Sequence, residues 1–454
     1  MATTSTKIRL ATASPATQST RQETLAQLEK LARSAGNRNA DFLLLPEAYF
    51  GGYPRGSDFG CKIGGRTEEG RDEFRRYFRE AIDLGDVVGP AGAGGLGKWV
   101  KRELRADTGD EDEGQNKDSG NEGSAKRRGD GTREELERIA RETGVFVVVG
   151  LVERAGGSLY CAVVYVCPRR GMIGKRRKVM PTGTERLIWA QGSPATLQAV
   201  STAIRGTRVN LAAAICWENY MPLLRQSLYA QNINLYFAPT ADGRDTWLPL
   251  MRTIGNEGRC FVVTSNMCVR EGTKHVPRER RNSCITEEGF EIALPSSPSS
   301  RKEGGSSSVS PLAGHGAGSA SKARRRSVFD EDGNEIVLSS PIEPPRSKIG
   351  LGLVVGASVS SSAIIEEDEV EDAKPAAETA KFASRGGSSI VSPFGEVLAG
   401  PQWEDDEGII YADVDMEDCV RGRLDLDAAG SYSRNDAFKL SVEGLDLSPL
   451  PYYA

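Results

Sequence analysis

The segment VNLAAAICWEN, residues 209–219, passes from a strongly apolar run directly into a polar turn. Val209 to Ile215 has the length and composition of a buried strand, and a helix is predicted shortly after it, from Pro222 to Ala230. Cys216 stands where the strand ends. Reactive groups in open α/β folds gather at the carboxyl ends of strands. The segment therefore predicts an α/β fold with a candidate site at Cys216.

A second segment has the same order of strand and polar residue. Phe42 to Leu45 is a predicted buried strand that stops at Pro46, and Glu47 follows directly. A partly desolvated carboxylate at such a position has a raised pKa and can act as a base near neutral pH. The alternative, which is more common for residues of this kind, is that Glu47 is solvated in a loop.

Strands and helices alternate along much of the chain, as in an α/β domain with buried sheets. Hydrophobic periodicity predicts further helices at residues 21–35, 74–84, 133–143 and 248–258. Further strands are predicted at residues 8–13, 145–152, 159–166, 233–238, 260–266, 389–391, 396–398 and 408–414.

The 454 residues are predicted to form one domain, 1–454, with two disordered inserts. The first insert, at about 105–133, has only Ala106 and Ala125 as apolar residues, so it cannot bury enough surface to offset the entropy of ordering. The second, at about 296–380, begins with a stretch rich in serine and glycine. The remaining chain is long enough for a single large core.

Charge and composition exclude several classes of partner. The 58 basic and 63 acidic residues give a net charge of −5, so no overall field favours nucleic acid or an anionic membrane. The longest apolar stretch, Val145 to Val152, is far shorter than the roughly 20 residues that span a bilayer. The first ten residues hold no apolar signal core, and the eight cysteines form no C-x-x-C pair. We therefore expect a cytoplasmic protein with reduced thiols.

The chain has two histidines, His275 and His315, which limits the chemistry available. A Ser-His-Asp triad, a Cys-His pair and a histidine-rich zinc site are all poorly supported. The segment Gly92 to Lys98 is similar to a phosphate-binding loop, but Trp99 occupies the place of the magnesium-binding Ser or Thr. If the protein is an enzyme, we expect its proton transfers to run through carboxylates or lysine.

Taken singly, the candidate residues carry weak signals. A thiol with its ordinary pKa is only a few per cent ionised at neutral pH, so a nucleophilic Cys216 needs a base or a cation beside it, and a buried structural cysteine is an equally good interpretation. Lys178 ends the basic run Lys175–Lys178, which could be a solvated turn. The apolar continuation Val179–Met180–Pro181 favours instead a run that enters the protein, and Glu185 follows soon after.

Six segments carry the candidate residues and other distinctive motifs: LLLPEAYFGGYP (43–54), KRRKVMPTGTER (175–186), CWENY (216–220), APTAD (238–242), RGGSSIVSPFGEVLAGP (385–401) and GSYSRND (430–436). Taken together, these motifs resemble those of the nitrilases, within the carbon–nitrogen hydrolase superfamily. The resemblance covers nearly everything outside the two inserts, and within the family the chain most resembles the fungal-type nitrilase branch. Two positions depart from the family pattern, Ser431 and Asn435, where many nitrilases have His and Pro.

The resemblance implies an α-β-β-α sandwich that pairs with a second copy into a four-layer αββααββα dimer or a longer spiral homo-oligomer. It implies hydrolysis of an organic nitrile with water to the carboxylic acid and ammonia, with no metal and no organic cofactor. Cyanide hydratase is the nearest alternative, followed by an amidase. The last alternative is a non-catalytic scaffold in which the inserts are the functional part.

The resemblance also implies a role for each site residue. Cys216 is the nucleophile that forms a thioimidate and then a thioester, and Glu47 is the general base. Lys178 stabilises charge that develops on the substrate nitrogen, and Glu185 positions Lys178 and the substrate. Trp217, through its backbone N–H, and Tyr53 bind the substrate.

Overall fold

The computed structural model describes residues 7–62, 65–85, 129–271, 283–285, 291–293, 327–329, 335–337 and 381–452. The glycine-rich segment 92–98 and most of both predicted inserts lie outside these residues. Residues 129–133, which the sequence assigns to the first insert, are described and lead into helix α3 (Thr132–Thr143). Residues 297–378 belong to a separate unit, of which only the paired strands β15 (Ser327–Phe329) and β16 (Glu335–Val337) are described.

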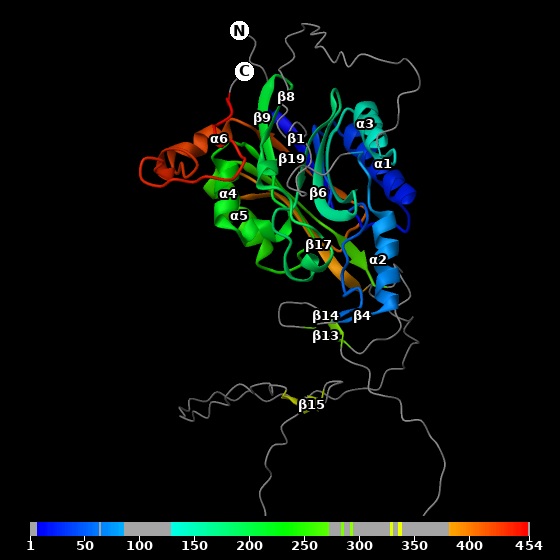
Figure 1. The fold of residues 1–454 in the computed structure, drawn as a ribbon. Helices are drawn as coiled ribbons and strands as arrows, with labels where there is room; N and C mark the ends of the chain where they lie inside the picture. Colours follow the sequence, from blue (N-terminus) through cyan, green and yellow to red (C-terminus); the bar gives the residue numbers. More distant parts are fainter. Residues whose placement is uncertain are drawn as a thin grey trace, which may run out of the picture. The chain divides into compact units, whose positions relative to one another are not determined.

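Two sheets form the centre of the larger unit (Figure 1). The first has the order β19-β1-β2-β5-β6-β7, and the second has the order β12-β17-β11-β10-β9-β8 with β18 paired to β17. Strands β1, β2 and β5 run parallel, as do β9, β10 and β11. The bounds in the first sheet are β1 (Lys7–Ala13), β2 (Phe42–Leu44), β5 (Phe146–Ala155), β6 (Ser158–Cys167), β7 (Gly171–Arg177) and β19 (Ile409–Asp415).

The bounds in the second sheet are β8 (Val200–Ile204), β9 (Thr207–Ala213), β10 (Leu235–Thr240), β11 (Phe261–Asn266), β12 (Cys268–Arg270), β17 (Phe382–Val391) and β18 (Val397–Trp403). Two short hairpins complete the described strands of this unit, β3 (Cys61–Lys62) with β4 (Gly65–Arg66) and β13 (Ser283–Ile285) with β14 (Glu291–Ala293). The described helices are α1 (Arg21–Asn37), α2 (Glu68–Glu80), α3, α4 (Pro222–Tyr229), α5 (Trp247–Gly258) and α6 (Asp418–Arg421).

The alternation of side chains along the strands builds the layers. In β2, Phe42 and Leu44 join an apolar cluster that also contains Leu211 and Phe237 of the second sheet, whereas Leu43 packs in a different cluster with α1 and α3. Successive residues of a strand point to opposite faces. The two sheets therefore bury one face against each other and the first sheet buries its other face under α1 and α3.

The second sheet is covered in the same way on its outer face. Ala212 and Tyr236 cluster with Leu228 of α4 and Met251 of α5. Figure 1 shows α1 and α3 on one side of the sheets and α4 and α5 on the other. The order helix, sheet, sheet, helix confirms the predicted α-β-β-α sandwich.

The sequence prediction misses three strands of the two sheets and the strands of the short hairpins, and it misplaces one helix. In the sheets, the missed strands are β7, β8 and β12. Strand β7 is missed because three of its seven residues are consecutive cations, which are typical of a solvated segment. The predicted helix 74–84 is wrong at both ends, since α2 spans Glu68–Glu80. Beyond it, the Ile82 N–H donates to the Val152 carbonyl at 2.8 Å, so the chain joins the first sheet by a β-bridge instead of continuing as helix. No helix in the described part of the chain is long and apolar enough to span a bilayer.

Candidate active site

Glu47 lies in a tight turn just beyond the carboxyl end of β2. The turn runs against β5: the Leu45 N–H donates to the Val148 carbonyl at 2.9 Å. At Gly150 the two segments approach so closely that a Cβ atom would stand 2.3 Å from the carbonyl oxygen of Pro46. Only glycine fits at this place. The approach holds the Glu47 side chain inward, where it is fully buried.

Cys216 follows the carboxyl end of β9 and opens the short 3-10 turn η4 (Cys216–Tyr220). Its backbone is left-handed, with φ of +53°, a conformation that is uncommon for a residue with a side chain. The Thr240 hydroxyl at the end of β10 donates to the Cys216 sulfur at 3.3 Å. The predicted delivery of Cys216 into a polar turn by a buried strand is confirmed.

Lys178 connects the two glutamates. It follows β7, and its Nζ donates to Glu47 Oε1 at 2.7 Å and to both Glu185 oxygens at 2.8 and 2.9 Å. Glu185 lies in the 3-10 turn η2 (Gly183–Leu187), where its Oε2 also accepts the Thr182 N–H at 2.7 Å. The structure thus brings together all four side chains proposed from the sequence as catalytic.

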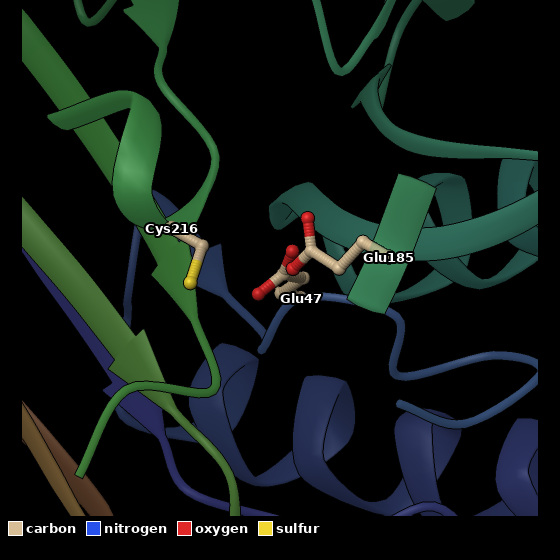
Figure 2. A group of neighbouring side chains, drawn as sticks. All are labelled: Glu47, Glu185 and Cys216. Carbon is tan, nitrogen blue, oxygen red and sulfur yellow. The ribbon is translucent and has the colours of Figure 1, made fainter. Parts of the chain in front are cut away.

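The thiol stands beside the two carboxylates. Figure 2 shows Glu47, Glu185 and Cys216 directed toward one another from three different parts of the chain. A carboxylate oxygen of each glutamate and the sulfur of Cys216 lie within 4.8 Å of one another. Among the described residues this is the one group of three or more such side chains spaced closely enough for a metal ion. The ammonium of Lys178, however, already donates to both carboxylates.

Burial sets the protonation states of the group. It raises the pKa of Glu47, a shift that Lys178 opposes and Glu185 reinforces. Burial also raises the pKa of the Cys216 thiol well above its usual value, with Glu47 adding to the shift. Burial alone would lower the pKa of Lys178, but Glu47, Cys216 and Glu185 together raise it well above its usual value. The group therefore holds a neutral thiol, a charged lysine and a carboxylate that binds a proton more readily than an exposed one.

The basic run before Lys178 is entirely buried. Lys175 and Arg177 donate to Glu153 of β5, with distances of 2.7 to 2.9 Å. Arg176 points the other way and donates to Glu218 at 2.6 Å. The interpretation of this run as a solvated turn is wrong, because buried carboxylates far away in the sequence neutralise it.

The two residues predicted to bind substrate differ in their contacts: Tyr53 bonds to a member of the group, whereas Trp217 bonds to a residue outside it. The Tyr53 hydroxyl donates to Glu185 Oε1 at 2.9 Å. Burial, together with Glu185 and Glu47, raises the pKa of Tyr53 well above its usual value. Trp217 follows the nucleophile, and its indole N–H donates to Asp242 at 3.1 Å. The Arg244 guanidinium lies 4.3 Å from the centre of the Trp217 ring and pairs with Asp242.

Several neighbours of the group are absent from the sequence prediction. The Cys161 thiol of β6 donates to Glu47 Oε1 at 3.5 Å, and Thr240 contacts the nucleophile. Glu153 and Glu218 are fully buried carboxylates. The sequence does hold a signal for the last two. A run of four cations that enters the core requires buried carboxylates, and both glutamates closely follow predicted apolar strands, 145–152 and 209–215.

Comparison of the sequence with known proteins identifies the family of the chain. Residues 7–309 match the family model described as carbon-nitrogen hydrolase. A nitrilase of Bradyrhizobium diazoefficiens is 33% identical over 422 residues, covering 93% of this chain and 86% of its own. An arylacetonitrilase of Trametes versicolor is 33% identical over 428 residues, covering 92% of this chain and 91% of its own. The bacterial and the fungal relative are equally similar, so a fungal-type branch stays a prediction.

A solved structure agrees with this fold. Saccharomyces cerevisiae Nit3, a member of branch 10 of the nitrilase superfamily, matches with a TM-score of 0.50 and 13% sequence identity. The match covers 95% of this chain and 97% of that one.

Proposed function

The chain belongs to the carbon–nitrogen hydrolase family, within which it is a nitrilase, and we propose that it hydrolyses an organic nitrile through a covalent intermediate on Cys216. The observation that best supports the proposed site is the buried ion pairing of Lys178 with both Glu47 and Glu185, close to the Cys216 thiol. This group supplies a nucleophile, a base and a cation without histidine.

The first step forms the carbon–sulfur bond. Sγ of Cys216 attacks the nitrile carbon, Glu47 accepts the thiol proton, and one carbon–nitrogen π bond breaks. The proton then passes to the nitrogen, which gives a neutral thioimidate. The raised pKa of Glu47 suits a base that must accept and return a proton near neutral pH. Its Oε2 has no hydrogen-bond partner in the described part of the chain and is available for this transfer.

Two waters complete the reaction. Glu47 deprotonates the first water as it adds to the thioimidate carbon, and ammonia leaves from the resulting tetrahedral centre to give a thioester. The second water, activated in the same way, displaces the Cys216 thiol and releases the carboxylic acid. Lys178, held by two carboxylates, stabilises the negative charge that develops in each addition. The balance is one nitrile and two waters to one acid and one ammonia.

The substrate panel that tests this function contains aliphatic, arylaliphatic and aromatic nitriles and cyanide, with acid, amide and ammonia measured separately. We expect equal amounts of acid and ammonia from at least one organic nitrile and no turnover by Cys216→Ser. Cys260→Ser, a change at another fully buried thiol, is the matched control and should keep activity. Formamide from cyanide alone would indicate a cyanide hydratase, and hydrolysis of amides alone would indicate an amidase. No turnover of any compound would favour the scaffold.

We also propose that the chain forms a homodimer or a larger spiral homo-oligomer in the cytoplasm. Exposed apolar side chains support an assembly, among them Leu398 of β18 and Tyr432 and Phe438 near the C-terminus. The seven cysteines whose side chains the structure describes are all free thiols, which supports a reducing compartment. Light scattering after size-exclusion chromatography would decide the assembly, and an active monomer would contradict it.

A further inference from the structure

Glu218 is a fully buried carboxylate that connects two segments of the site. Its Oε1 accepts hydrogen bonds from Arg176 Nη2 at 2.6 Å, from the Val179 N–H at 2.6 Å and from the Met180 N–H at 3.3 Å. Its Oε2 accepts the Ile215 N–H at 2.8 Å. The first three donors flank Lys178 in the sequence, and the last donor directly precedes Cys216.

One side chain therefore joins the segment of the cation to the segment of the nucleophile. These segments come from different sheets, since Lys178 follows β7 at the edge of the first and Cys216 follows β9 in the second. Arg176 strengthens the same connection, because its Nη1 donates to the carbonyl of Ala213, the last residue of β9. A charged acceptor makes such hydrogen bonds shorter and stronger than neutral ones.

The nucleophile turn needs this support. Cys216 has a left-handed backbone, which persists only where the surroundings hold it. Asn219 holds one side of the turn, since its amide group donates to the carbonyls of Ala214 and Cys216 at 2.9 and 2.7 Å. Glu218 holds the other side through Ile215.

We propose that Glu218 is a positioning residue that sets the placement of the Cys216 thiol relative to the Lys178 ammonium. This inference rests on the proposed roles of Cys216 and Lys178. Glu218 does not react with substrate; it acts through the two segments that it joins. A displacement of about 1 Å between reacting groups can lower a rate roughly 100-fold, so the connection matters to the chemistry as well as to the fold.

Glu153 provides a matched comparison. It is also fully buried and also pairs with cations of β7, but Lys175 and Arg177 join it to a strand within the first sheet. Its hydrogen bonds to Lys175 and Arg177 connect β5 with β7 and stay within that sheet. Replacing either carboxylate by an amide removes a buried charge of the same kind, and only the change at Glu218 disturbs the link to Cys216.

The first test is Glu218→Gln. The amide oxygen should stay where three donors converge, so the amide nitrogen would face the Ile215 N–H and that bond would be lost. We expect kcat to fall about 30- to 100-fold with KM within about threefold, as for a loss of alignment. Glu153→Gln should lose a similar amount of melting temperature but keep kcat within about threefold. Both kcat values are measured at a temperature where near-ultraviolet circular dichroism shows that the two variants are folded.

The second test, Glu218→Asp, covers the case in which the glutamine variant does not fold. Aspartate keeps the charge for Arg176 but is one methylene shorter, so it cannot reach both segments. We expect a folded protein whose kcat is at least tenfold lower. A folded Glu218 variant with the kcat of Glu153→Gln, or with a change in KM alone, would overturn the inference. If Cys216→Ser were active, the proposed function itself would fail; if it is inactive and the Glu218 variants are active, only this inference fails.

Discussion

The last residues of β7 and Lys178, which follows the strand, direct lysine and arginine side chains into the core on two opposite faces, and the two faces differ in their carboxylate partners. On one face, Lys175 and Arg177 share the single carboxylate of Glu153. On the other face, Arg176 contacts Glu218, and Lys178 contacts Glu47 and Glu185. All these side chains are almost completely buried. The first face thus has more cations than carboxylates, and the second has more carboxylates than cations.

This difference in charge balance separates structural from reactive carboxylates. Burial raises the pKa of both Glu153 and Glu47, yet two cations more than compensate at Glu153, whose pKa is lowered. At Glu47 a single lysine is shared with Glu185, and the pKa stays raised. Burial alone therefore does not make a base: the base arises where a buried carboxylate lacks a cation of its own and lies beside a proton donor.

The largest expected effect comes from exchanging the carboxylates of the two faces for amides. Glu47→Gln should lower kcat about 100- to 10,000-fold, because the general base is lost while the shape is kept. Glu153→Gln should cost about 3–5 kcal/mol of stability, because two buried cations lose their partner, while kcat of the folded protein changes little. Steady-state kinetics and urea unfolding of both variants check this. Equal losses of kcat at the two sites would remove the distinction between the faces.

A similar contrast is expected between the lysines. Lys178→Met should lower kcat about 100- to 1000-fold, because the charge that stabilises the additions is gone. Lys175→Met should leave kcat within a few-fold, since Arg177 still donates two hydrogen bonds to Glu153. The comparison is made from kcat at saturating nitrile. An active Lys178→Met enzyme would show that the ammonium is not needed in the rate-limiting step.

The pH dependence of the unaltered enzyme tests the raised pKa of Glu47. The base must be ionised, so kcat/KM should fall as the pH drops through that pKa, and a raised pKa places this acid limb above the usual 4.5. The raised pKa of Lys178 keeps the lysine charged through the alkaline range. A pH–rate profile with circular dichroism at each pH checks the limb. Full activity of folded enzyme down to pH 4.5 would contradict the assignment.

The smallest expected effect concerns the neighbour of the nucleophile. Thr240→Val removes the hydroxyl that donates to the Cys216 sulfur and keeps the shape of the side chain. One hydrogen bond is worth about 0.5–1.5 kcal/mol, so kcat/KM should fall about 2- to 12-fold. The rate of iodoacetamide modification of Cys216, followed by peptide mass spectrometry, should change in step with kcat/KM. No change in either would mean that the hydroxyl does not act on the sulfur.

The sequence predicts the face with Glu47, Lys178 and Glu185 better than the face with Glu153. Glu47 and Cys216 stand at the ends of apolar strands, so local pattern places them, and the motifs around Lys178 and Glu185 resemble those of nitrilases. Strand β7 escapes prediction because Lys175, Arg176 and Arg177 are typical of a solvated segment. Their burial depends on Glu153 and Glu218, which lie tens of residues away along the chain, and such pairing has no local periodicity.

The proposed mechanism requires the nitrile to become covalently attached to Cys216, and peptide mass spectrometry of the quenched enzyme detects this bond. Unaltered enzyme stopped with acid during turnover, and Glu47→Gln after long incubation, would be digested and compared with Cys216→Ser. We expect a mass increase matching the nitrile, or the acyl group derived from it, on the peptide that contains Cys216 and on no other. An adduct on a different residue, or turnover that continues in Cys216→Ser, would contradict it.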